Sequence, residues 1–519
     1  MTYTIIQTLL DAMTSPILWS VALCCGALII ANAGLNDESE DYEDLEDDFQ
    51  FTRADLEEYR EFIETTNRLI TEKTEELDAG ADPKTTLPEL VSLYLSRAAR
   101  YHEEGEFEPA VDDYAAAFAR YAEYVDLFDE SLELLKIVAA GRLNYGILLN
   151  DAGELSDADE EYARAEQATQ KLADFGDRDA KIDLVGTRLN RASIAFDLGD
   201  HTGSIESLDD VAEEFRKIID DPETIGTEAL FYLAKTCFTK ASLLRSILDV
   251  NDLDSPDALE ASAALKEAID VYRRLIAGGE TQYRRDLADA LVLGVSSTPT
   301  RSKEELVAAS DALAEACNAY HQVITYGEHD ACVDLFDASL QRAKILMRLE
   351  LFDDALALYT TVVESFKSFG DTDELPLVEG LATAYLNRAK LRKGSVKPNV
   401  LVADLTEAIR LQSAVARSLI KSLGGSDCDD CCCEHEHEHL SETARNFLME
   451  RWAFENFRNL MECYYERINA RLEERDTVNA AADCLAAEDA ARAYRSVLRE
   501  GESFDEETLD AIRRVRRNL

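Results

Sequence analysis

The sequence predicts an all-α protein in which antiparallel helical hairpins stack into an α-solenoid, preceded by a hydrophobic helix at the N-terminus. Two observations carry this prediction. Gly (22) and Pro (9) together supply 31 of the 519 residues, too few for the many turns of an all-β chain. A pattern of small residues also recurs every 46 to 53 residues, as a helical repeat array requires. Because 46% of the residues are hydrophobic, a chain disordered throughout is excluded.

The charge balance limits the classes of partner. Asp and Glu number 105 against 53 Lys and Arg, which gives a formal net charge of -52. Such a field repels phosphate backbones, so non-specific binding of nucleic acid is excluded. The same field favours a basic protein or peptide as the partner.

The N-terminal segment, residues 1–35, contains an apolar stretch from Pro16 to Ala33. Its length is near the lower limit for a transmembrane helix, and we expect a single-pass membrane protein. The first positive residue is Arg53, which places the large domain on the cytoplasmic side. A signal peptide cleaved near Ala33 and a buried helix are the alternatives. Residues 36–52 form an acidic linker.

A leading helix is expected within residues 53–84, over 53–78, because Leu56, Tyr59, Phe62 and Ile63 recur at helical spacing. A repeat array follows over 85–423. In five segments of it a small residue stands three residues after a leucine and sixteen before a tyrosine or leucine. These small residues, the anchors, are Ala98, Gly146, Ala192, Ala343 and Ala389, and weaker matches at Ala241 and Ala290 complete the series.

The spacing has a simple physical reason. Two antiparallel helices joined by a short turn need small residues where their axes approach most closely. Glycines in the turns, such as Gly105 and Gly153, end the first helix in a left-handed conformation. The pattern therefore predicts stacked helical hairpins.

These units resemble the tetratricopeptide repeat, most clearly at residues 95–119, 143–168 and 340–363. The resemblance covers about 85–410. The usual unit has about 34 residues, so the extra residues here would lengthen each helix by about one or two turns. The resemblance implies a superhelix whose concave groove binds an extended peptide or a helix of a partner protein.

The resemblance also implies that polar side chains on the first helix of each pair line this groove. The column two residues before the anchors contains amides that can bond a peptide backbone, and the next column contains arginines. The candidate groove residues are Asn144, Asn190, Gln341, Asn387, Arg191 and Arg388. For the arginines an alternative is pairing with acidic residues of neighbouring helices, such as Asp113.

A Cys/His-rich loop over 424–440 suggests a second function, the handling of a metal. Thiolates and imidazoles are ligands that Zn, Cu and Ni accept, so the loop could bind one of these metals. Its candidate ligands are Cys428, Cys431, Cys432, Cys433, His435, His437 and His439. A low-complexity insertion without a role is the alternative. The match of His435 to His439 with a zinc-protease motif lacks the amphipathic helix that the motif needs.

Residues 441–519 predict long helices that cap the array, because a solenoid needs terminal units with a polar outer face. The sequence lacks the nucleophile-elbow, P-loop and dinucleotide-binding motifs. We therefore predict a non-enzymatic scaffold for protein–protein interaction with no resident cofactor.

Overall fold

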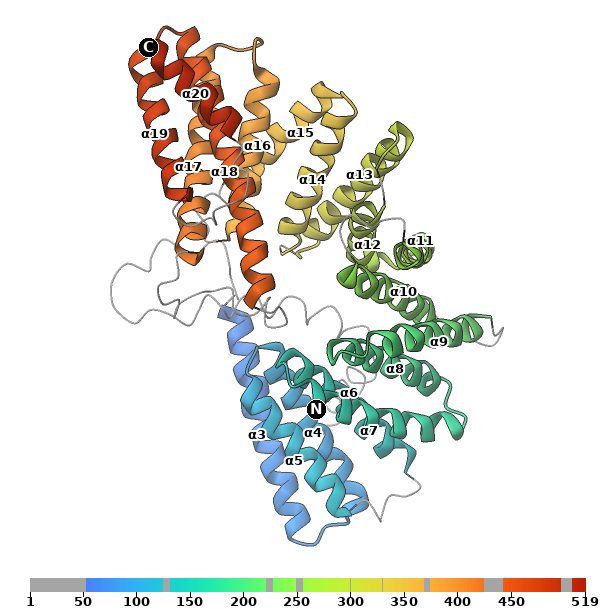
Figure 1. Cartoon of the computed structure of the whole chain (residues 1–519). Helices are drawn as coiled ribbons and strands as arrows, with labels where there is room; N and C mark the ends of the chain where they lie inside the picture. Colours follow the sequence, from blue (N-terminus) through green and yellow to red (C-terminus); the bar gives the residue numbers. More distant parts are fainter. Residues whose placement is uncertain are drawn as a thin grey trace, which may run out of the picture. The chain divides into compact units, whose positions relative to one another are not determined.

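The computed structural model describes residues 53–124, 131–220, 227–248, 255–298, 300–328, 330–367, 374–423, 442–495 and 506–519. These residues form helices joined mostly by short turns, and no β-strand occurs among them. Figure 1 shows the helices paired in succession along the chain. Two compact units divide the chain, one ending at Tyr283 and the other beginning at Arg284.

The first unit consists of a leading helix and four hairpins. The leading helix α3 packs against α4, and the hairpins pair α4 with α5, α6 with α7, α8 with α9 and α10 with α11. First helices of neighbouring hairpins also touch, α4 with α6 and α8 with α10. The bounds are α3 Arg53–Asp78, α4 Pro83–Glu103, α5 Phe107–Tyr124, α6 Leu132–Asp151, α7 Leu155–Asp174, α8 Asp179–Asp197, α9 His201–Ile219, α10 Thr227–Ile247, α11 Pro256–Ala277 and the 3-10 turn η2 Thr281–Tyr283.

The second unit repeats the same plan. Its hairpins pair α12 with α13, α14 with α15, α16 with α17 and α18 with α19, and α20 packs on the last pair. The bounds are α12 Arg284–Ser297, α13 Lys303–Thr325, α14 Ala331–Arg348, α15 Phe352–Phe366, α16 Leu375–Arg392, α17 Pro398–Leu423, α18 Glu442–Glu473, α19 Thr477–Arg495 and α20 Glu506–Asn518.

Several helices begin at a serine that caps the first turn. The side chains of Ser131 and Ser255 accept hydrogen bonds from backbone amides three residues on. Ser302 makes the reciprocal pair with Glu305 that forms a capping box. These caps satisfy amide groups that the helix itself leaves without an acceptor.

The anchors lie at the closest approach of the paired helices, as predicted. Ala98 and Ala343 are fully buried. At Gly146 the approach is closer still, because a Cβ atom there would lie 2.6 Å from the ring of Tyr162. The hairpin architecture, an all-α fold of tandem helical repeats, is therefore confirmed.

The turns within hairpins follow one geometry. Gly105, Gly153 and Gly199 end the first helix with φ between 73° and 95°, the left-handed region that glycine adopts without strain. At the equivalent places of α14 and α18 stand Glu350 and Arg475, both with φ of 62°. Two hairpins thus keep the turn although a side chain makes it less favourable.

The predicted localisation, a single-pass membrane protein, is wrong, because one finding contradicts it. Across the helices that the structure describes, none combines the length and the apolar character that a membrane crossing needs. Residues 1–35, which carried the prediction and the alternative of cleavage near Ala33, lie outside the described residues, as does the acidic linker 36–52.

Candidate partner-binding surface

The arginine column predicted for the groove is engaged inside the protein. Arg388 on α16 is 5% exposed and binds both carboxylate oxygens of Asp404 on α17, at 3.0 and 2.7 Å. Its remaining nitrogen binds Glu364 at 3.0 Å. Arg191 on α8 binds Asp159 at 2.9 Å and Glu166 at 2.8 Å on α7. The alternative, arginines paired with acids of neighbouring helices, is the one that the structure supports.

Three of the described hairpins share one arrangement, which we call the Arg–Asp clamp. An arginine on the first helix binds an aspartate sixteen residues later, on the second helix, through both carboxylate oxygens. The aspartate is nearly or fully enclosed in each case. The clamps are Arg97–Asp113, Arg388–Asp404 and Arg467–Asp483.

The third clamp shows that α18 and α19 form a further repeat unit. Ala480, Cys484 and Ala487 on α19 are fully buried, twelve, sixteen and nineteen residues after Ile468. Small or apolar residues hold the same offsets in the earlier hairpins. Because the residue at the anchor position is Ile468 rather than a small residue, the alignment on alanine and glycine misses this unit.

Two of the predicted amides also have partners within the protein. The amide of Asn387 donates to the Tyr359 hydroxyl oxygen, on the second helix of the preceding hairpin, at 3.1 Å. Gln341 donates to Asp337, one turn earlier on its own helix, at 2.7 Å. Each amide therefore has one of its N–H groups engaged within the protein.

Asn144 on α6 and Asn190 on α8 are different. Each stands two residues before its anchor and is partly exposed. Within the described part of the chain, no side chain or backbone group forms a hydrogen bond with either amide group. An asparagine amide offers one acceptor and two donors, so both side chains can still bind a ligand.

A carboxylate lies on the same face of α8 as Asn190. Asp183 precedes Asn190 by seven residues, two helical turns or about 10 Å along the helix. Burial, together with the negative charges of Glu228, Asp179 and Asp177, raises the pKa of Asp183 to about 7. The nearby ammonium of Lys136 is bound to Asp177, so Asp183 lacks an ion-pair partner among the described residues.

Glu228, at the start of α10, faces Asp183. Burial and the charge of Asp179 raise the pKa of Glu228. Its Oε1 atom is buried without a hydrogen-bond partner among the described residues. The hydroxyl of Tyr232 is close enough to both carboxylates to feel their charge, and this, after burial, raises the pKa of Tyr232.

Three of these residues make one candidate surface, which we call the inner surface: Asp183 and Asn190 on α8, and Glu228 on α10. Gly186 lies against the Tyr232 ring, and a Cβ atom there would meet the ring in ordinary van der Waals contact, at 3.4 Å. The surface offers an open amide beside carboxylates that form no ion pair with the residues that the structure describes.

The asparagine of this surface, Asn190, was predicted and the acids were not. Asp183 is a single acid in an apolar stretch of the sequence. Whether its charge is buried depends on which other helices face it, and the sequence does not show this. Sequence spacing alone does not show that Lys136 is already bound elsewhere.

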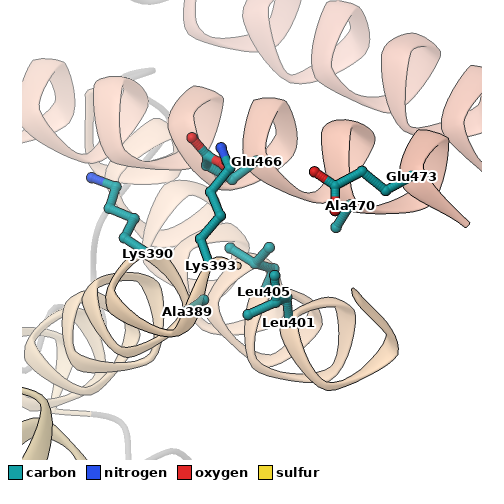
Figure 2. A pocket seen from close by; sticks show the side chains of 8 residues that line it. All are labelled: Ala389, Lys390, Lys393, Leu401, Leu405, Glu466, Ala470 and Glu473. Carbon is teal, nitrogen blue, oxygen red and sulfur yellow. The ribbon is translucent and has the colours of Figure 1, made fainter. Parts of the chain in front are cut away.

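A small cavity lies among α16, α17 and α18, and it is too small for a ligand. Figure 2 shows its lining, with Lys393 and Glu466 pointing toward each other across an apolar floor. Their ion pair measures 2.7 Å. The cavity has a volume of about 10 Å³, room for about one water molecule.

The predicted metal ligands, Cys428 to His439, lie outside the described residues. In the part of the chain that the structure does describe, no group of three His, Cys, Asp or Glu side chains is arranged to hold a metal. The cysteines there include Cys237 and Cys463, which are buried. Burial raises the pKa of each thiol to about 12, so both stay protonated.

No family model and no curated protein matches the sequence. Among solved structures, BtubC from P. vanneervenii is similar at 16% identity and a TM-score of 0.38, over 52% of this chain and 93% of that one. A STAND signal-transduction ATPase with a tetratricopeptide-repeat sensor from Pyrococcus horikoshii shares 11% identity at a TM-score of 0.35, over 93% and 66%. The TPR2AB domain–pHSP90 complex of yeast Sti1 shares 16% identity at a TM-score of 0.19, over 55% and 94%.

These likenesses are too distant to bear on function. The predicted resemblance to the tetratricopeptide repeat is confirmed at the level of the fold, since the chain itself forms tandem hairpins with a buried alanine or glycine at each of the five anchors.

Proposed function

We propose that this protein is a non-enzymatic scaffold that binds a basic, extended segment of a partner protein on the inner surface of the first unit. The observation that carries the proposal is Asp183, a largely buried carboxylate that forms no ion pair within the described part of the chain. Burial of an unpaired charge is unfavourable, and a lysine or arginine from a partner would relieve it. Glu228, with a buried oxygen that lacks a partner, would gain in the same way.

The spacing on α8 favours a peptide as the ligand. Asn190 can bond a peptide backbone on both its donor and its acceptor edges. Asp183 lies about 10 Å away along the helix, the length of about three residues of extended chain. A basic side chain about three residues from the bonded backbone would therefore reach Asp183.

The test uses fluorescein-labelled peptides with the full-length protein. The probe has the sequence Ala-Ala-Lys repeated five times, and its control replaces each lysine by glutamate. Fluorescence anisotropy at 50 and 300 mM NaCl gives the affinities. We expect binding of the lysine peptide only, weaker at the higher salt because exposed charges are screened.

Variants then separate this surface from general attraction to an acidic protein. Asp183→Asn and Glu228→Gln should each weaken binding about fivefold, and Asn190→Ala should weaken it without changing the dependence on salt. Glu206→Gln, an exposed acid on α9, is the matched control and should have no effect. If all four variants bind equally while salt still weakens binding, the attraction is non-specific and the proposal is wrong.

A further inference from the structure

A separate hollow opens among α9, α10 and α11. Its volume is about 510 Å³, within the range of pockets that bind ligands. Its floor is apolar, with Leu233 and Val271 almost fully buried. The lining residues are Arg216, Ile219, Asp220, Leu230, Leu233, Ala263, Lys266, Glu267, Asp270, Val271 and Arg274.

This hollow, the outer pocket, is distinct from the inner surface. Leu230 and Leu233 of α10 line the pocket, whereas Glu228 and Tyr232 of α10 face the inner surface. Residues two apart on a helix point about 200° from each other, because each residue turns by about 100°. The two surfaces therefore lie on opposite sides of α10.

The charges of the outer pocket are unusual for so acidic a chain. Arg216 and Glu267 neutralise each other through two bonds of 2.9 and 2.8 Å, and Asp270 lies 3.8 Å from Arg273. Lys266 and Arg274, both on α11 and exposed, form no ion pair with the described residues. Asp220 is the remaining acid of the lining.

The two cations are about 12 Å apart along α11, beside an apolar floor. This arrangement suits a ligand with carboxylates spaced around a large apolar side chain. An acidic partner from solution would meet the repulsion of a chain with net charge -52. A segment tethered to the same unit avoids much of this cost, because tethering raises its effective concentration to the millimolar range.

We propose that residues 37–51 of this chain occupy the outer pocket. The segment carries nine acidic residues and no lysine or arginine, with Tyr42, Leu45, Phe49 and Phe51 as large apolar side chains. It directly precedes α3 of the same unit, which begins at Arg53. Fifteen residues can span up to about 50 Å, so the segment can extend well beyond the start of α3 over its own unit.

Zero-length crosslinking of the full-length protein tests the proposal. A carbodiimide joins carboxylates to lysine amines that touch them, and peptide mass spectrometry identifies the pairs in the monomer fraction. We expect Lys266 to be joined to acids of residues 37–48 at about five times the yield found for Lys171, a ratio that one exposed ion pair provides. Lys171 is an exposed lysine on α7 of the same unit.

Variants identify the contacts. Arg274→Glu and Leu45→Ser with Phe49→Ser should each bring the Lys266 yield down to that of Lys171. Arg68→Glu, the same charge change on the exposed side of α3, should leave it unchanged. Equal yields at Lys266 and Lys171 in the unaltered protein, or crosslinks from Lys266 to a different segment or a second copy, would overturn the proposal.

Discussion

Asp183→Asn should stabilise the protein at neutral and alkaline pH. When it is fully ionised, a carboxyl group whose pKa rises from 3.8 to about 7 on folding lowers the free energy of unfolding of the protein by about 4 kcal/mol. Water penetration and small rearrangements reduce this figure. We therefore expect the substitution to raise the free energy of unfolding by about 1–3 kcal/mol at pH 8.

The dependence on pH gives the sharper test. The folded protein holds the Asp183 proton more tightly than the unfolded chain does, so stability falls as pH rises from about 4 to about 7. Asp183→Asn removes this contribution. The gain in stability should therefore be large at pH 8 and small at pH 4.5.

The assay is urea unfolding followed by far-ultraviolet circular dichroism at both pH values. Asp112→Asn, an exposed acid on α5, is the matched control and should change stability little at either pH. A gain for Asp183→Asn that is the same at both pH values would refute the reasoning, because the effect would then not come from the charge.

Four further predictions concern the repeat. Arg388→Met should destabilise the protein by about 3–5 kcal/mol, because Asp404 is left buried and unpaired; adding Asp404→Leu should recover most of this loss in the same urea assay. Gly146→Ala should destabilise by about 1–3 kcal/mol, since the new Cβ meets a tyrosine ring at 2.6 Å, whereas Gly186→Ala, with 3.4 Å of space, should be neutral or stabilising. Glu350→Gly should raise the free energy of unfolding by about 0.5–1 kcal/mol, because glycine adopts the positive φ there without strain. The melting temperature should therefore rise slightly, and a lower one would contradict the strain argument. Raising NaCl from 0.1 to 1 M should raise the melting temperature of the unaltered protein, since salt screens the repulsion within a chain of net charge -52; a fall would show that ion pairs outweigh that repulsion.

The hairpins could be predicted because close helix packing leaves a direct trace in the sequence. Ala98 and Gly146 recur in register because no larger residue fits where two helix axes meet. The leading helix was predicted over 53–78 and spans Arg53–Asp78, since the segment before Pro83 breaks the helical pattern. Local periodicity and small residues were sufficient for both.

The candidate site could be predicted only in part, because it depends on which helices face each other. Asn190 and Asn387 stand at equivalent positions, yet only Asn387 meets a tyrosine hydroxyl of the preceding hairpin in the described structure. Asp183 became notable only when Glu228 and Lys136, distant in sequence, were placed around it. No spacing rule within one helix carries this information.

The Arg–Asp clamps are found in the first complete hairpin, α4–α5, and in the last two, α16–α17 and α18–α19. On the intervening α8, Arg191 binds across to Asp159 of the hairpin before it, and on α10, Lys240 binds both Asp209 of the preceding hairpin and Glu260 of its own. A hairpin near the end of a stack has fewer neighbours to hold it, so fraying should begin there unless it closes on itself. The internal clamps supply that closure, and amide hydrogens of α4 and α18 should therefore exchange with solvent as slowly as those of α8.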